Sequence, residues 1–521
     1  MKKLIFLIAL MMFVGCNDQL DLTNPNEPTA DTFWETESDA VRASHAMYNG
    51  LIMDGTYMRM IPALTDGRSD GFKADTPWPD LWQVAAFNVP ATSGPVEWVW
   101  REHYVLIYRA NQILEYVPEM EIDEALKERI VGQAHFLRGL AYFNLANNFH
   151  RVPISDALPD PDEFNEPTAS EEDLWQQIID DFSDAKDRLP VSYENIDGPD
   201  QGQVGRATAG AATGMLGKAY LYREQWQNAA SEFELLIPGA GESSPMEVYD
   251  LVDNFRHNFN IDNENNVESL FEVQFADPDQ VGGSEMNYCC EPNSNWMQVS
   301  SQSYTYAAEG YGYSDFLPTQ WLYDEFNEEQ TVSGNKDPRL LDTIVSYEPG
   351  ENSTTVYGDP WPYGQDEIYP RKYTHEGLPY AELREQSGIN YRVLRYADIL
   401  LMYAEAQNEL DDRATAAQYM QQVRDRANLP DRTAEFTGFT RDEMREQIAH
   451  ERALEFAIEG QRIHDMIRWG WFDESSPRYK VPELQQRDAE FNSWDTGDEY
   501  LPIPQRELDV NPNLEPNPAN D

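Results

Sequence analysis

Positive charge is scarce in this chain of 521 residues. Only 38 Lys and Arg stand against 93 Asp and Glu, which gives a formal net charge of −55 at pH 7. Such a surface repels the phosphates of nucleic acids and the headgroups of anionic lipids, so the composition argues against binding to either. The apolar and aromatic fractions, 41% and 12%, are ordinary for a globular protein, so the chain is not a disordered acidic polymer.

Long hydrophobic runs are missing as well. The apolar run over residues 4–14 is far shorter than the roughly 20 residues that span a bilayer, and no other segment approaches a span. The run follows a basic start and ends at Gly15-Cys16, as in a secretory signal. Because a Cys directly follows the small residue, the segment resembles a bacterial lipoprotein signal, in which residues 1–15 are removed and Cys16 is lipidated. An ordinary cleaved signal with an incidental cysteine is the alternative.

Cysteine is the third scarcity, with three in the whole chain. Once Cys16 carries a lipid, only the neighbours Cys289 and Cys290 remain. Two cysteines outside the cell are free to pair, and a bond between neighbours closes a small strained ring that kinks the backbone. A vicinal disulfide and a pair of buried reduced thiols are both open at this point.

Helical signals dominate what the chain does contain. Thr36 to Asp39 form a capping-box pattern, which predicts a helix that runs to about Ile52. Two further helices are predicted over residues 96–116 and 121–149. In the last of these, apolar residues recur at helical spacing and mark one buried face.

Internal repeats indicate how such helices are arranged. GKAYLYREQWQNAASEFELL, which begins at Gly217, has small residues and an aromatic at the offsets of a tetratricopeptide helix pair. There the small residues let two helices approach and the aromatic fills the space between them. Residues 396–430 repeat the arrangement, a split copy lies at 139–142 and 182–190, and a fourth pair is expected at 441–468. We therefore predict a mainly α fold with a tetratricopeptide-like helical-repeat scaffold.

Residues 238–385 interrupt this scaffold. Gly, Pro, Asn, Ser and aromatics crowd in there, and only short strand-like runs such as ESLFEVQF remain. A structureless loop of that size is unusual in a compact protein, so we interpret the region as an irregular, ligand-binding subdomain. The predicted parts are a helical part at 16–237, this loop-rich subdomain, and a helical part with a tail at 386–521. Residues 16–521 are expected to form one compact unit.

Two aromatic-rich stretches, at residues 66–82 and 288–313, are the candidate ligand sites. The apolar C–H faces of sugar rings stack on flat aromatics, and sugar hydroxyls need polar partners nearby. Both stretches interrupt helical scaffold, so we expect them to meet on one face. The alternative is that most of these rings are core of the loop-rich subdomain. The candidate glycan-binding residues are Asp66, Arg68, Trp78, Trp82, Tyr288, Trp296, Tyr304, Tyr306, Tyr311 and Tyr313.

Signals for a metal or for catalysis are weak. NIDNENNVE, residues 260–268, has oxygens suited to Ca²⁺ but lacks the spacing and the turn glycine of an EF-hand, so a solvated turn is expected. Carboxylate pairs for glycoside hydrolysis are not diagnostic in a chain with 93 acidic residues. We expect no catalytic residues, no metal and no cofactor.

Five stretches carry a family resemblance, in this order: TFWETESDAVRASHAMYNGL, AHFLRGLAYFNLANNFHRVPI, RVLRYADILLMYAEAQNE, HERALEFAIEGQRIHDMIRWG and YLPIPQRELDVNPNLEPNP. They resemble the SusD-like (SusD/RagB) family of outer-membrane nutrient-binding lipoproteins. The resemblance implies a lipid anchor in the outer membrane, on the side that faces the cell exterior. It also implies helical repeats that pack against a SusC-like TonB-dependent barrel, and an irregular part that binds oligosaccharide without catalytic machinery.

Three functions therefore compete. The first is a surface lipoprotein that binds oligosaccharide and delivers it to the transporter. The second is a peptide-binding member of the same family, and the third is an acidic surface glycoside hydrolase. For the first function the acidic surface favours a neutral sugar, because a polyanionic glycan would be repelled.

Overall fold

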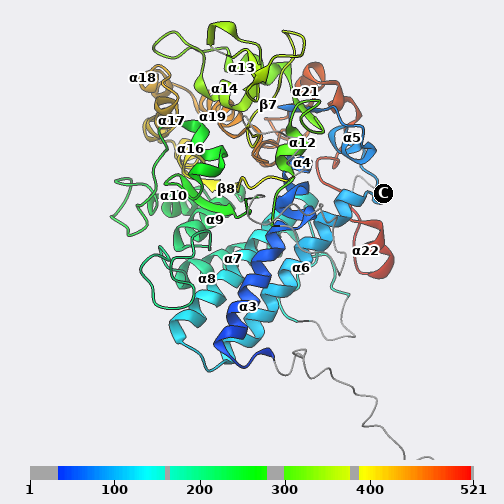
Figure 1. Ribbon diagram of the computed structural model, residues 1–521, viewed down its shortest axis with the longest axis vertical. Coiled ribbons are helices and arrows are strands. Elements are labelled where there is room, and N and C mark those ends of the chain that lie inside the picture. The colour runs from blue at the N-terminus through cyan, green and yellow to red at the C-terminus, as the bar shows by residue number, and fades with distance from the viewer. Residues whose placement is uncertain (1–32, 159–164, 278–297, 352, 376–385, 518–521) are drawn as a thin grey trace, which may run out of the picture.

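The computed structural model describes residues 33–158, 165–277, 298–351, 353–375 and 386–517. The fold is mainly helical, as predicted, and the strands are few and short. Figure 1 shows the long N-terminal helices together at one end of the molecule and the short elements of the loop-rich segment at the other.

The N-terminal end is built from α3 (Glu37–Tyr48), α6 (Gly94–Tyr116), α7 (Glu124–Phe149) and α8 (Glu171–Arg188). The predicted capping box is present at α3. The Thr36 hydroxyl accepts from the Asp39 N–H, and the Asp39 carboxylate accepts from the Thr36 N–H at 2.9 Å. The helix ends at Tyr48, and a 3₁₀ turn over Asn49–Ile52 continues it to the predicted end.

The helical repeats are confirmed at the positions where small residues face aromatics. In the pair α9 (Ala209–Tyr222) and α10 (Trp226–Glu234), a Cβ added at Gly217 would lie 2.5 Å from the Phe233 ring. Between α7 and α8, a Cβ at Gly139 would lie 3.1 Å from Phe182. Glycine therefore sets the closeness of both pairs. The later pairs are α16 (Tyr396–Glu409) with α17 (Arg413–Arg426), and α19 (Arg441–Phe456) with the short α20 (Arg462–Arg468).

Short antiparallel ladders run through the loop-rich segment. Two of them link it to the rest of the chain: β1 (Phe72–Ala74) pairs with β3 (Phe316–Pro318), and β2 (Ser269–Val273) pairs with β8 (Tyr391–Arg395). The other two lie within the segment: β4 (Ile344–Val345) pairs with β7 (Tyr369–Pro370), and β5 (Thr355–Val356) pairs with β6 (Asp359–Pro360). The predicted strand in ESLFEVQF is β2. Further short helices are α4 (Met60–Asp66), α5 (Pro79–Ala85), α12 (Gln302–Tyr306), α13 (Gln320–Phe326), α14 (Pro338–Thr343), α18 (Thr433–Thr437), α21 (Val481–Arg487) and α22 (Gln505–Val510).

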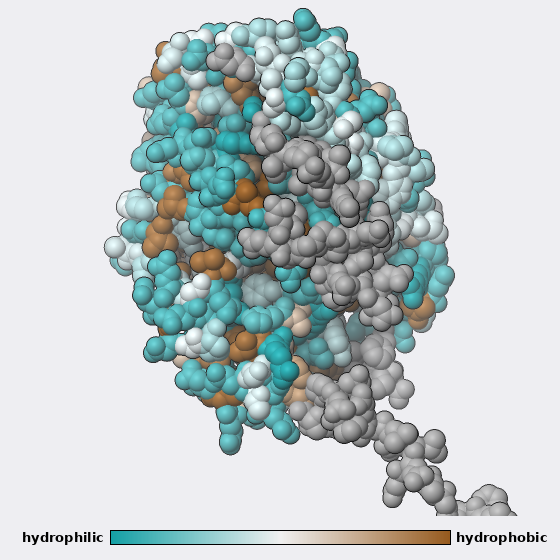
Figure 2. Space-filling view, in the orientation of Figure 1, coloured by the Kyte–Doolittle hydropathy of each residue, from teal (hydrophilic) through white to brown (hydrophobic). Residues whose placement is uncertain are grey.

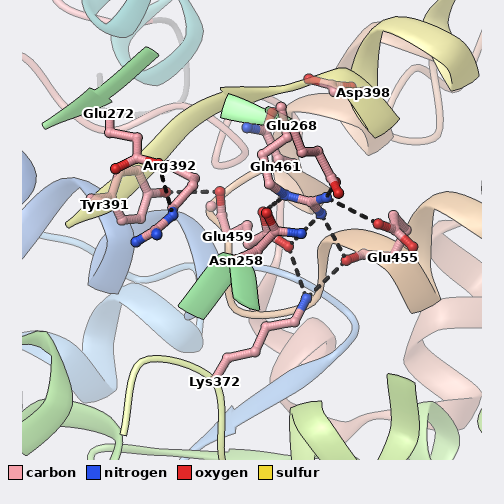
Figure 3. Close-up of polar contacts among 12 residues, drawn as sticks. Asn258, Glu268, Glu272, Lys372, Tyr391, Arg392, Asp398, Glu455, Glu459 and Gln461 are labelled. Carbon is pink, nitrogen blue, oxygen red and sulfur yellow. Dashed lines mark hydrogen bonds and ion pairs between the residues drawn. The ribbon is translucent and has the colours of Figure 1, made fainter. Parts of the chain in front are cut away.

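A buried charge network joins the loop-rich segment to the C-terminal helices (Figure 3). Arg395 binds both oxygens of Glu459, at 2.7 and 2.9 Å, and Glu455 at 3.0 Å. Lys372, from the loop-rich segment, reaches Glu459 at 2.8 Å. Arg339 of α14 lies 3.4 Å from Glu455. The side chains in these pairs are at most 2% exposed, so their charges depend on one another rather than on water.

The scarce cations are concentrated inside the protein. At least thirteen of the 38 Lys and Arg side chains are buried. The face in Figure 2 is mostly hydrophilic, and its hydrophobic residues are scattered rather than joined in one patch. At least seventeen Asp and Glu side chains are buried with them, so the surface keeps the strong net negative charge of the whole chain. None of the helices in the described part of the chain combines the length and the apolar composition that crossing a bilayer requires.

We predict that Arg395→Met lowers the free energy of unfolding by about 3–5 kcal/mol, because it leaves buried carboxylates without their cation. Chemical denaturation at pH 7 measures the change. Arg413→Met is the matched control, since the Arg413 side chain is 31% exposed and pairs with the largely exposed Asp411. It should cost no more than about 0.5 kcal/mol. Equal losses in the two variants would contradict the role of the network.

Candidate ligand surface

A tight loop after α12 brings two of the predicted tyrosines, Tyr304 and Tyr313, together. The Tyr313 N–H donates to the Tyr304 carbonyl at 2.7 Å, so the chain doubles back on itself. The turn depends on glycine, because Gly310 has φ +90° and a Cβ at Gly312 would lie 2.3 Å from the Tyr304 carbonyl oxygen. As a result the Tyr304 and Tyr313 rings pack edge to face, 4.9 Å apart, while Tyr313 stays 38% exposed.

Two further rings join this loop from the segment 357–364. The Tyr363 hydroxyl donates to the Glu309 carbonyl, which ties the two segments together. Trp361 packs edge to face on Tyr363, with centroids 5.7 Å apart, and its indole N–H donates to Gly364 at 2.9 Å. Neither ring is among the ligand residues predicted from the sequence. The only local signal was YGDPWPYG, in which Gly and Pro surround the aromatics.

We define the aromatic patch as Tyr304, Tyr311, Tyr313, Trp361 and Tyr363, all of which are partly exposed. The patch rests on a small apolar core of its own, made of Ala307, Ala308, Val345, Val356, Tyr357 and Tyr369. Val345 and Tyr369 are paired residues of the β4–β7 ladder. The patch therefore has a folded base rather than lying on free loops.

Polar groups surround the rings. The Tyr311 hydroxyl donates to Asp359 at 2.9 Å, and Asp359, Glu309 and Glu367 are exposed. Burial, with the Asp359 carboxylate, raises the pKa of Tyr311 to about 12. Burial likewise raises the pKa of Tyr363 to about 12. Both hydroxyls are therefore neutral at physiological pH, and each donates its hydrogen within the protein, to Asp359 and to the Glu309 carbonyl, so its oxygen can accept.

The described part of the second predicted stretch, residues 298–313, contacts the first, because the Tyr306 hydroxyl donates to Asp66 at 2.8 Å. Just beyond that stretch, β3 pairs with β1, and the Asp75 N–H donates to the Asp315 carbonyl at 2.9 Å. In the first stretch, Trp82 lies on α5 and is 49% exposed. Trp78 is held by its indole N–H, which donates to Asp80 at 2.9 Å.

Comparison with known proteins identifies the fold. A family model described as the SusD family matches residues 267–519, and one described as starch-binding associating with outer membrane matches residues 65–221. The SusD-like protein P2 of Formosa agariphila is 26% identical over 547 residues, which cover 99% of this chain and 98% of that protein. A SusD superfamily structure from Bacteroides vulgatus is 29% identical, with a TM-score of 0.78, and the match covers 94% of this chain and all of the other. The chain belongs to the SusD-like family.

A second solved structure is described as a laminarin-binding SusD-like protein. It is 26% identical to this chain and superposes with a TM-score of 0.74 over 93% of this chain and 99% of its own. The match to the SusD family model includes the whole aromatic patch, residues 304–363. The SusD-like assignment thus extends over the loop-rich segment and is not confined to the helical repeats.

Three predicted glycan-binding residues are instead structural. Asp66, Arg68 and Tyr306 are at most 2% exposed and have protein partners. The Tyr306 hydroxyl donates to Asp66 at 2.8 Å, and the Gly460 N–H donates to its other oxygen at 3.0 Å. Arg68 donates to the Glu499 carbonyl at 2.6 Å. These side chains are not available to a surface ligand, because α4 and the turn after it lie in the core.

Several predictions fall on residues outside those that the structure describes. They are Cys16, Tyr288, Cys289, Cys290 and Trp296. Lipidation at Cys16, the vicinal disulfide and the ligand contacts of Tyr288 and Trp296 remain predictions.

The candidate calcium segment, residues 260–268, is a turn whose side chains bond to the protein. The Asn266 amide donates to the Asn263 carbonyl at 3.0 Å, and Glu264 accepts from the Asn390 N–H at 2.7 Å. Burial raises the pKa of Glu264 to about 7, which lowers its charge at neutral pH. Oxygens of this segment thus accept hydrogen bonds from the protein itself.

We predict that Asp66→Asn flattens the pH dependence of stability. Burial raises the pKa of Asp66 from 3.8 to about 7, although hydrogen bonds from Tyr306 and Gly460 oppose the change. A raised pKa favours the folded state at low pH, and this contribution is lost as the pH rises from about 4 through 7. Asn keeps the neutral geometry, accepting from Gly460 and donating to Tyr306.

Chemical denaturation at pH 4.5 and 7.5 tests this. The free energy of unfolding of Asp66→Asn, relative to that of wild type, should be higher at pH 7.5 than at pH 4.5. The control is Asp324→Asn, which removes an exposed carboxylate from α13 and should follow the wild-type profile. Parallel profiles for Asp66→Asn and wild type would show that Asp66 is not the titrating group.

Proposed function

We propose that this SusD-like chain is a surface lipoprotein that binds a neutral oligosaccharide on the aromatic patch and delivers it to a TonB-dependent outer-membrane transporter. One observation carries the binding part of the proposal. Partly exposed rings from two segments about 50 residues apart lie together on a folded base, beside tyrosine hydroxyl oxygens and exposed carboxylates that can accept hydrogen bonds. Stacking surfaces beside hydrogen-bonding groups are what a sugar ring requires.

The relatives support a carbohydrate ligand. The laminarin-binding SusD-like structure and the family description that mentions starch both concern glucose polymers, which carry no charge. Laminarin oligosaccharides are therefore the first probe, and maltooligosaccharides are the second.

The charge of the patch favours a neutral ligand over an anionic one. Exposed carboxylates at Asp359, Glu309 and Glu367 flank the rings, and the whole chain has a net charge of −55. A sulphated or uronate-rich glycan would meet like charge there, at a cost that salt reduces but does not remove. Uncharged hydroxyls can instead donate to these carboxylates.

The base of the patch is positioned by the buried network. Arg339 lies in α14, the helix that leads into β4, and Lys372 lies two residues after the end of β7. Arg339 binds Glu455 in the last turn of α19, and Lys372 binds Glu459 just after that helix. A buried ion pair thus holds the chain before β4, and another holds it after β7. Pre-organised rings lose little freedom when a ligand stacks on them, which favours affinity.

We predict that Tyr313→Ala and Trp361→Ala each weaken oligosaccharide binding about tenfold, since an interface aromatic contributes about 1–2 kcal/mol. The double variant should lose measurable binding. Isothermal titration calorimetry with laminarin and maltooligosaccharides measures the affinity, and circular dichroism checks the fold. The matched control is Tyr108→Ala on α6, a tyrosine that is 49% exposed on the helical end of the molecule.

The same titrations separate the alternatives. Trp82→Ala tests whether the ligand extends onto α5. If both patch variants bound sugar with wild-type affinity, the binding site would have to lie outside the aromatic patch. Tight binding of a short peptide would favour the peptide-binding alternative, and release of reducing ends from the glycan would reveal a hydrolase.

The anchoring and delivery parts of the proposal have their own test. Cys16→Ala should release the protein from membranes, because the thiol is the expected lipid acceptor. Wild-type protein purified from native membranes should bring a TonB-dependent barrel with it. Membrane retention of Cys16→Ala would refute the anchor, and the absence of any barrel would remove the support for delivery.

A further inference from the structure

Away from the aromatic patch, two helices bring together a mixed set of nitrogen and oxygen donors. Glu325 lies near the end of α13, Glu328 follows three residues later, and His450 comes from α19. One ligand atom of each lies within 4.8 Å of the other two. The His450 Nδ1 and a Glu325 carboxylate oxygen are 2.8 Å apart.

The spacing is close to that of a metal site. Donors bound to Zn²⁺ at about 2.0–2.2 Å lie roughly 3.3–3.6 Å apart in a tetrahedron. A shift of about 1 Å in the exposed Glu328 side chain would bring the third donor to this spacing. One imidazole and two carboxylates suit Zn²⁺, and partial exposure leaves room for a water in the fourth position.

The surroundings help to hold and balance such an ion. The Trp321 side chain hydrogen-bonds to Glu325, which orients a donor from outside the coordination shell. Glu451, next to His450, is already paired with Arg424 and Arg339, so the charge that balances the ion comes from the two ligand carboxylates. Arg487, which acts electrostatically on Glu325, is paired with Asp70.

We propose that Glu325, Glu328 and His450 form a Zn²⁺ site that clamps the loop-rich segment to α19. Two carboxylates and a neutral imidazole neutralise the ion, and the strongly acidic surface raises the local concentration of cations. Because α13 and α19 belong to different parts of the fold, one ion cross-links them. Bound Zn²⁺ therefore stabilises the folded chain by mass action.

The test titrates Zn²⁺ into chelator-treated, full-length mature protein against a chromophoric competitor at pH 7.5. Wild type should bind one Zn²⁺ per chain, and its Tm should rise with the ion. His450→Ala and Glu328→Gln should each weaken this binding at least tenfold. Glu328 is exposed, so Glu328→Gln reports on the site even if His450→Ala disturbs packing.

Asp324→Asn is the matched control, because it removes the same charge from α13 on the other side of Glu325, where Asp324 accepts from Gln320 at 2.8 Å. It should bind Zn²⁺ like wild type. A tenfold excess of Ca²⁺ should not compete, because Ca²⁺ takes oxygen rather than imidazole donors. Failure of wild type to bind Zn²⁺, equal affinity in Glu328→Gln and Asp324→Asn, or displacement by Ca²⁺ would each overturn the site.

Discussion

The carboxylates of Glu455 and Glu459 are the constraint on which the loop-rich segment depends. They bind Arg395 at the end of β8, Lys372 just after β7 and Arg339 from α14. Although burial raises the pKa of Glu455, the neighbouring guanidinium groups hold it below its usual range. Burying these charges is costly, and the cost is offset only in one arrangement of the partners. The network thus specifies how the irregular chain sits on the helices.

The same charge distribution shapes the surface. A chain with few cations places many of them inside, where they compensate carboxylates that would otherwise be buried alone. What remains outside is dominated by acidic groups, which suits a neutral, hydroxyl-rich ligand better than an anionic one. Fold specificity and ligand preference therefore both follow from how the few cations and the many carboxylates are distributed between the interior and the surface.

The sequence predicts those features whose causes are local. The capping box at Thr36 and the pairing of Gly217 with Phe233 can be seen within a few turns of helix, and both are present. Asp66 and Arg68 were placed wrongly because their partners, such as Gly460 and Glu499, lie about 400 residues away. In the sequence, a polar loop that faces solvent and a polar turn that is buried have the same kinds of residues. Only the distant hydrogen-bond partners, which the structure reveals, tell the two apart. The aromatics of the segment 357–364 were missed for a related reason, since Gly and Pro surround core and surface rings alike.

The central claim is that a pre-organised aromatic patch holds the sugar. Hydrogen–deuterium exchange of the full mature chain, with and without a saturating oligosaccharide, tests it most directly. The account predicts slower exchange in residues 304–314 and 357–364, with no change in α6 and α8. Protection confined to the helical end would contradict it.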